Sequence, residues 1–110
     1  MPTSADAAPA LRRNWFHILL AVSRGAAHGY AIRKEVEEHT RGELTLWPAT
    51  LYGTLQDMES AGLLSEAQDS GDGGRERRTY RMTDAGRAAL AAETERLAAL
   101  VDLARAASAS

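Results

Sequence analysis

The stretch WPATLYGTLQDMESAGLL, residues 47–64, decides the fold of this chain. Pro48 stands where a helix accepts proline, in its first turn, and Gly62 ends the same helix. One face of this helix is apolar, with three residues at helical spacing: Leu51, Leu55 and Met58. The other face, near the helix start, holds polar or small groups without strong charge: Thr50, Tyr52, Gly53 and Thr54. The stretch therefore predicts an amphipathic helix whose exposed face begins uncharged.

Two further helices are predicted before this stretch. The first ends at Gly25 and has a clear apolar stripe at helical spacing, formed by Leu11, Trp15, Ile18, Leu19 and Val22. The second runs from about residue 30 to residue 39 and buries Ile32 and Val36. Residues 44–46 read as a very short strand. Trp47, between that strand and the third helix, is expected to pack in the core.

After Gly62 the hydrophobic period changes from helical to alternating. Residues 63–67 and 77–82 are predicted to be strands, and the Gly-, Asp- and Ser-rich residues 68–75 form the loop between them. Thr83 is a good N-cap, and no strong helix breaker follows it up to about residue 107. The predicted order is helix, helix, short strand, helix, strand, strand, long helix.

This order is that of a winged helix with an extra C-terminal helix. The predicted fold class is mainly α with a small β wing: a winged helix-turn-helix plus a long C-terminal dimerisation helix. In this organisation residues 1–10 form a flexible tail, residues 11–82 the winged-helix DNA-binding domain, residues 83–107 the dimerisation helix, and residues 108–110 a frayed end.

Length and composition limit the class of protein. The chain has 110 residues, enough for one domain. It has no cysteine, which excludes disulfides, thiol nucleophiles and thiolate metal sites. No apolar run approaches the ~20 residues of a membrane span, and the N-terminus lacks the pattern of a secretory signal. We therefore expect a cytoplasmic protein without membrane contact.

The basic residues gather in two patches, although the formal net charge is −2. Residues 11–41 hold six basic and three acidic side chains, and residues 71–87 hold five basic and three acidic ones. Residues 43–70 hold five acidic side chains and no basic one. Lys34 is the only lysine, and the arginines that make up the rest suit phosphate and guanine. The patches keep nucleic acid as a candidate partner.

The third helix carries the first candidate DNA contacts. A helix that reads DNA lies in the major groove with its N-terminal part against base edges. The residues here that could contact bases or phosphates are Thr50, Tyr52 and Thr54. Lys34, on the second helix, is a further candidate. The alternative is an ordinary surface helix whose polar face has no binding function. Asp57 and Glu59, further along the helix, favour this alternative.

The predicted hairpin carries the second set of candidate contacts. Arg75, Arg77 and Arg78 cluster at its glycine-rich loop, from which arginines can reach phosphates or a minor groove. A solvated hairpin is the alternative, and Asp69 and Asp72 support it. We favour DNA because the cluster falls where a wing lies.

The last helix is the candidate for self-association. Roughly 25 residues make a helix about 37 Å long, which is longer than the side of so small a domain. A second subunit could cover the apolar stripe that is left. The candidate dimer contacts are Trp15, Ile18, Leu90, Leu97, Leu100, Val101 and Leu103. The alternative is a helix that folds back on its own domain.

No pattern in the sequence predicts catalysis. The three histidines, His17, His28 and His39, lie on different segments at spacings unlike a metal site, and His17 is interpreted as structural. No set of nucleophile, base and acid is recognisable. The glycines at 71–74 belong to a hairpin and do not open a helix, so they form no phosphate cradle. The chain is predicted to be no enzyme and to use no metal or cofactor.

Taken together, four stretches resemble the PadR family of bacterial transcriptional regulators, specifically its short-tailed members. They are Trp15, Phe16, Ile18, Leu19 and Leu20; His28, Gly29, Tyr30, Ala31 and Ile32; Pro48, Ala49, Thr50, Leu51, Tyr52, Leu55 and Met58 with Gly62 and Leu63; and Gly73, Gly74, Arg75, Arg77, Arg78, Tyr80, Arg81, Thr83, Ala85 and Gly86. The resemblance extends over about residues 11–107, nearly the whole chain, and all four stretches occur in order at family spacing.

The resemblance implies a homodimer that binds a palindromic DNA operator and usually represses. It implies that Tyr52 contacts DNA with Thr50 nearby, that the wing arginines hold the backbone, and that a small aromatic or drug-like effector releases the protein. Multidrug-binding relatives line a pore at the dimer interface with an aromatic residue of the last helix. Residues 88–110 contain no aromatic residue, so we expect large planar drugs to bind weakly or not at all, with Trp15 and Phe16 left as the aromatic candidates.

A different class of function stays open at this point. A winged helix can also dock a partner protein after losing DNA binding, and the acidic segment 43–70 and the net charge favour that alternative. Binding to random duplex DNA at low salt separates the two.

Overall fold

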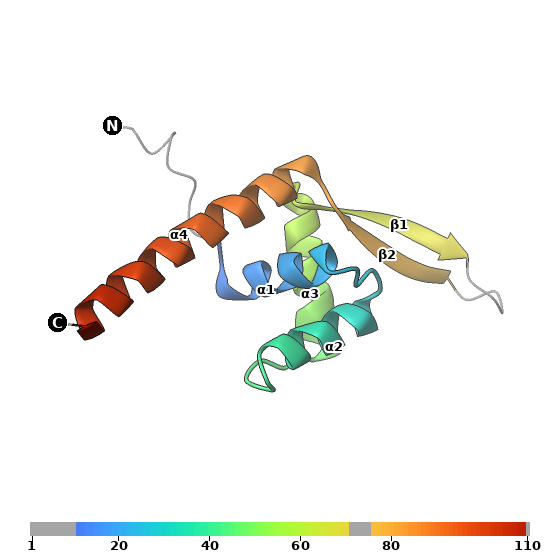
Figure 1. Cartoon of the computed structure of the whole chain (residues 1–110). Coiled ribbons are helices and arrows are strands. Elements are labelled where there is room, and N and C mark those ends of the chain that lie inside the picture. Colours follow the sequence, from blue (N-terminus) through green and yellow to red (C-terminus); the bar gives the residue numbers. More distant parts are fainter. Residues whose placement is uncertain (1–10, 71–75, 110) are drawn as a thin grey trace.

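The structure is a computed structural model that describes residues 11–70 and 76–109 (Figure 1). The elements are α1 (Arg13–Ser23), α2 (Gly29–His39), α3 (Pro48–Ser60), β1 (Leu64–Ser70), β2 (Glu76–Met82) and α4 (Asp84–Ala109). The mainly helical fold with a small β wing and a long C-terminal helix is confirmed. The predicted tail at residues 1–10 lies outside the described residues.

Helices α1, α2 and α3 form a three-helix body around one hydrophobic core. Its largest fully buried side chains are Ile18, Leu19, Ile32, Val36, Leu46, Leu51, Leu55 and Met58. Hairpin β1–β2 and the far end of α4 project from opposite sides of this body (Figure 1), and the molecule measures 60 × 35 × 21 Å. Such an outline leaves most of α4 and the hairpin outside the protomer's own core.

The prediction of a strand at residues 44–46 is wrong. This segment has no regular secondary structure and pairs with no strand, and Leu46 is buried in the core instead. The place of a third strand beside β2 is taken by the turn before α2. There His28 forms an isolated bridge with Thr79, and the Tyr80 N–H donates to the Ala27 carbonyl at 2.8 Å. The hairpin is therefore anchored to the start of α2.

The two strands are longer than the sequence predicts. β1 and β2 are antiparallel, in a register that begins at Leu64 opposite Met82 and ends at Ser70 opposite Glu76. The polar residues 68–70, expected in a loop, continue the ladder. A two-stranded ribbon is open to solvent on much of its surface, so polar residues cost it little.

Thr83 alone joins β2 to α4. Its hydroxyl donates to the Gly62 carbonyl at 2.6 Å and accepts from the Gly86 N–H at 2.9 Å, so it is the N-cap that the sequence predicts. Its N–H donates to the Leu63 carbonyl at 3.1 Å. A β-carbon at Gly86 would overlap that same Leu63 carbonyl, which explains the glycine in the first turn of α4. This one-residue joint between β2 and α4 is thus held by hydrogen bonds to residues 62–63 and to the first turn of α4.

Helix α4 has 26 residues and is about 39 Å long. It continues to Ala109, two residues beyond the predicted end. Glu93 anchors its middle, because the carboxylate pairs with Arg96 and accepts from the Leu11 N–H at 3.3 Å. These hydrogen bonds hold the pKa of Glu93 below its ordinary value. Within the described ranges, no helix is both long enough and apolar enough to cross a membrane.

Candidate nucleic-acid interface

Helix α3 exposes the face that the sequence predicts. Thr50 and Tyr52 are exposed, whereas Leu51 and Leu55 between and after them are buried. The Thr54 hydroxyl donates to the Thr50 carbonyl at 2.8 Å, which ties it to the helix backbone. The first turn of α3 contains no acidic residue, and no side chain caps its N-terminus. The start of α3 therefore presents hydroxyl groups and backbone N–H groups without a repelling carboxylate.

The phenol ring of Tyr52 reaches from α3 to the start of α2. It lies against Gly29, the first residue of α2, which is buried. The Tyr52 side chain is nevertheless 46% exposed, so one side of the ring contacts α2 and the rest faces solvent. Tyr52 thus bridges the two helices of the helix-turn-helix pair.

Two exposed aromatic residues were missed by the sequence reasoning. Tyr30 in the first turn of α2 is 68% exposed, and Trp47 at the N-cap of α3 is 64% exposed. The expectation that Trp47 packs in the core is wrong, because the Arg33 guanidinium lies over its ring, 5.4 Å from the centroid, at the surface. For Tyr30 a signal was available: it falls outside the apolar period of α2. Lys34, one turn after it, is exposed on the same face.

Of the three candidate arginines of the hairpin, the structure describes the side chain of one, Arg78. The Arg78 Nε is 3.0 Å from the Glu66 Oε2, and the Arg78 side chain stays 61% exposed. Arg77 belongs to β2 opposite Asp69, but its side chain lies outside what the structure describes, as does the whole of Arg75. Arg78 is therefore paired with a carboxylate of the neighbouring strand.

Two acidic residues, Glu59 and Glu66, interact with each other near Arg78. Burial raises the pKa of Glu59, on α3, and the charge and hydrogen bond of Glu66 raise it further. Burial also raises the pKa of the Tyr80 hydroxyl, with Glu66 as the next cause. Glu66 thus interacts with Glu59, Arg78 and Tyr80 together at the base of the hairpin.

The family follows from comparison with known proteins. Residues 18–92, more than half of the chain, match the model described as the transcriptional regulator PadR-like family. The chain belongs to the PadR-like family of transcriptional regulators. Members of this family are regulators and not enzymes, in agreement with the sequence prediction.

Relatives of this PadR-like chain resemble it over most of its length. It is 44% identical over 89 residues to Transcriptional regulator Rv3488 of Mycobacterium tuberculosis, which is 81% of this chain and 77% of that protein. A PadR family regulator from Eggerthella lenta superposes with a TM-score of 0.65 at 32% identity, over 82% of this chain and 78% of that one. Bacillus subtilis PadR, solved in complex with operator DNA, shares the fold with a TM-score of 0.65 at 21% identity, over 74% of this chain and 46% of that one.

The predicted dimer contacts of the PadR-like chain divide into two groups. Leu100, Val101 and Leu103 on the far half of α4 are exposed, and Leu97 is half-buried. The other three face the protomer itself: Trp15 and Leu90 are partly buried against the core, and Ile18 is wholly buried within it. Ile18 is therefore corrected to a core residue, because a side chain with no exposed surface has nothing to offer a partner.

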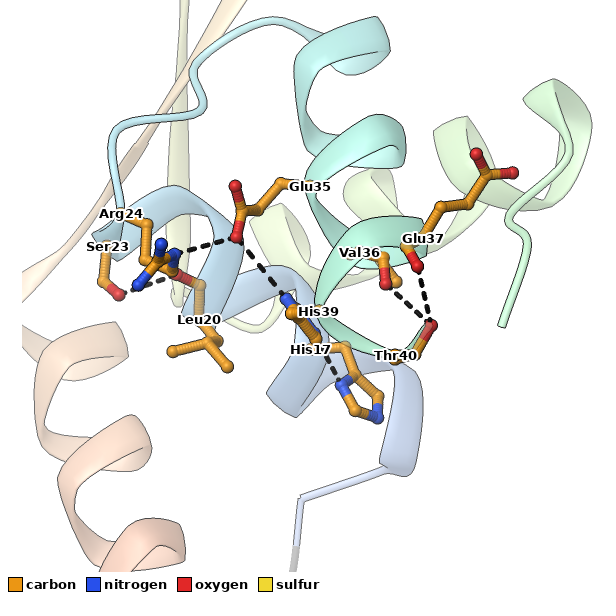
Figure 2. A network of polar contacts seen from close by, with 9 residues as sticks. All are labelled: His17, Leu20, Ser23, Arg24, Glu35, Val36, Glu37, His39 and Thr40. Atoms are coloured by element: carbon orange, nitrogen blue, oxygen red, sulfur yellow. Dashed lines mark hydrogen bonds and ion pairs between the residues drawn. The ribbon is translucent and has the colours of Figure 1, made fainter. Parts of the chain in front are cut away.

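Two of the three histidines of the PadR-like chain, His17 and His39, form part of a network of polar contacts between α1 and α2 (Figure 2). His17 Nδ1 lies 2.9 Å from His39 Nε2, and His39 Nδ1 lies 3.8 Å from Glu35 Oε2. The Arg24 Nε donates to the same Glu35 oxygen at 2.8 Å. Among residues 11–70 and 76–109, no group of three or more potential ligands is placed to hold a metal ion. These contacts join two helices, which is a structural role.

Proposed function

We propose that this PadR-like regulator is a homodimeric repressor that binds duplex DNA through α3 and the hairpin. The observation that carries the proposal is the exposed, acid-free start of α3, with Thr50 and Tyr52 on its surface. Exposed Tyr30 lies in the first turn of the neighbouring helix α2, and exposed Lys34 lies one turn further along it. The related Bacillus subtilis protein, with the same fold, is known bound to operator DNA. We infer that α3 occupies a major groove and that the hairpin arginines contact phosphates.

The dimer is inferred from the far half of α4. Leu100, Val101 and Leu103 together expose apolar surface that water disfavours, and burying one such side chain is worth about 1.5–3 kcal/mol. A second copy of the helix, related by a two-fold axis, could bury the same stripe on both chains. Two copies of α3 would then meet two half-sites about one turn of DNA apart, which makes the operator palindromic.

We place the protein in the cytoplasm, where a regulator reaches DNA. An effector that stacks on an aromatic ring would use Trp15 or Phe16 of α1, because residues 88–110 contain no aromatic residue. Large planar drugs are therefore expected to bind weakly or not at all. Tight binding of such a drug, with quenching of tryptophan fluorescence, would contradict this expectation.

Selection of bound fragments from the source genome tests DNA binding and identifies the operator in one experiment. We expect enriched palindromic fragments, and affinity that falls as salt rises. Tyr52→Ala should weaken binding to the selected fragment while its thermal unfolding stays close to that of the parent. A promoter that carries the fragment should lose transcription in a purified system when the protein is added. Absence of binding to any duplex at low salt would overturn the proposal in favour of a protein-docking module.

A further inference from the structure

The contact between Tyr52 and Gly29 leaves no room for a side chain on α2. A β-carbon built on Gly29 would lie 2.5 Å from the Tyr52 Oη, 2.9 Å from its Cζ and 3.0 Å from its Cε1. Carbon atoms in ordinary contact lie about 3.5–4.0 Å apart. Any residue other than glycine at position 29 would therefore displace the phenol from its present place.

The backbone gives no other reason for this glycine. Among the residues that the structure describes, Gly25, Gly42 and Gly62 have positive φ angles, whereas Gly29 does not. Gly29 begins a regular helix, where alanine is intrinsically the better residue. The three nearest atoms that a β-carbon would meet all belong to the far end of the Tyr52 side chain, so we expect an alanine at this position to move Tyr52 and to leave the fold in place.

The start of α2 is itself fixed to the hairpin. The Ala27 carbonyl accepts from the Tyr80 N–H at 2.8 Å, and His28 bridges to Thr79. A ring that lies on Gly29 is therefore held at a defined distance from β2 as well as from α3. Tyr52 is positioned relative to both elements through which we propose that DNA is bound.

We propose that Gly29 is a positioning residue for Tyr52: its missing side chain lets the phenol lie on the first turn of α2, and so fixes the tyrosine before DNA arrives. The proposal rests on the DNA-binding function proposed above. A side chain that is held in its binding position loses less conformational freedom on association than one that is free to rotate. Displacing the ring should then cost affinity without unfolding the protein.

The test is a double-mutant cycle on the full chain with Gly29→Ala, Tyr52→Ala and the double variant. Affinity for the selected operator fragment is measured by fluorescence anisotropy. We expect Gly29→Ala to weaken binding about tenfold in the parent, the loss of one specific contact. In the Tyr52→Ala background the same change should have no effect, because no ring is left to displace. A Tyr52→Phe variant, which keeps the ring but not the hydroxyl, should still respond to Gly29→Ala.

Thermal unfolding of the same four proteins supplies a readout that does not involve DNA. In the Tyr52→Ala background Gly29→Ala should raise the Tm, since alanine favours the helix. In the parent that gain should be reduced or lost, because the ring must move. Equal effects in both backgrounds, in stability or in affinity, would show that Gly29 does not act through Tyr52.

The outcomes separate this inference from the function on which it rests. If the parent and every variant fail to bind duplex DNA at low salt, the proposed function is overturned and the positioning role with it. If the parent binds DNA and Tyr52→Ala does not, but Gly29→Ala binds as the parent does, only the inference about Gly29 is overturned.

Discussion

His17 Nδ1 and His39 Nε2 lie 2.9 Å apart and join α1 to α2 by a hydrogen bond between two imidazoles. One ring must donate and the other must accept, so protonation of the accepting nitrogen breaks the bond. Burial lowers the pKa of His17, and the charges of His39 and Arg13 lower it further. The pair is therefore a point at which acid weakens the contact between the two helices.

The first prediction concerns the pH dependence of stability. The folded-state pKa of His17 lies below its ordinary value of 6.5, so the unfolded chain binds the proton more readily. The stabilisation of the folded state by neutral His17 is complete above about pH 6.5. It is lost as the pH falls through the folded-state pKa. The parent should lose more Tm between pH 8 and pH 5 than His17→Asn does. Equal losses in the two proteins would mean that His17 does not contribute to the acid sensitivity.

The second prediction concerns Arg78 and its partner Glu66. If Arg78 contacts a phosphate, Arg78→Gln should weaken binding on every DNA sequence alike and lower the salt slope by about one. Glu66→Gln should instead strengthen binding at low salt, because it frees the arginine. Exposed ion pairs are worth about 0–1 kcal/mol, so the gain should not exceed about fivefold. Anisotropy titrations on random duplex at several salt concentrations measure both, and a loss confined to one operator sequence would contradict the phosphate role.

The third prediction compares two glycines in helices. At Gly86 a β-carbon would overlap the Leu63 carbonyl and approach the Met82 Cγ to 2.8 Å, so Gly86→Ala should destabilise the fold by about 1–3 kcal/mol. A β-carbon at Gly53 would meet no atom within 4 Å beyond its own helix backbone and chain neighbours, so Gly53→Ala should stabilise the fold by about 0.5–1 kcal/mol. Urea unfolding measures the two opposite changes. A stable Gly86→Ala variant would show that the joint before α4 can relax.

The fourth prediction separates core from proposed interface. Leu100→Asp with Leu103→Asp should leave the protomer folded, because both side chains are exposed, but should convert a dimer into a monomer. Ile18→Ala should destabilise the protomer by about 2–5 kcal/mol, because this residue lies wholly in the core. Sedimentation at micromolar concentration and thermal unfolding distinguish the two effects. A parent that sediments as a monomer would remove the dimeric mechanism.

Truncation is the fifth prediction. A chain that ends at Ala92 lacks the exposed apolar half of α4 but keeps the hairpin and the three-helix body. It also loses Glu93, whose carboxylate accepts from the Leu11 N–H. We expect a less stable monomer that binds the operator poorly, measured by unfolding, sedimentation and anisotropy. Parental affinity in the truncated chain would contradict a dimer held by α4.

Local signals in the sequence were enough to predict the order of the elements. Pro48, Gly62 and Thr83 mark helix boundaries through backbone chemistry that acts within a few residues, and α3 and α4 begin where these residues place them. The apolar period likewise separated buried Leu51 from exposed Tyr52, because helical geometry alone decides which of the two faces the body.

The errors concern relationships between segments that are distant in sequence. Residues 44–46 have the composition of a strand, but pairing depends on which neighbour occupies the edge of β2, and residues 27–28 occupy it. Ile18 and Trp15 share one stripe, and periodicity cannot divide that stripe between the protomer's core and a partner. The contact of Tyr52 with Gly29 joins two helices, so no sequence pattern within either helix predicts it.

The single residue between β2 and α4 also sets a rotational phase. An α-helix turns by about 100° per residue, so one residue inserted beside Thr83 would swing the exposed leucines of α4 by roughly that angle around the helix axis, relative to the hairpin. In a two-fold dimer this angle decides how far apart, and in which relative orientation, the two copies of α3 stand. For the proposed dimer, the length of the connection between β2 and α4 would therefore set the spacing of the operator half-sites.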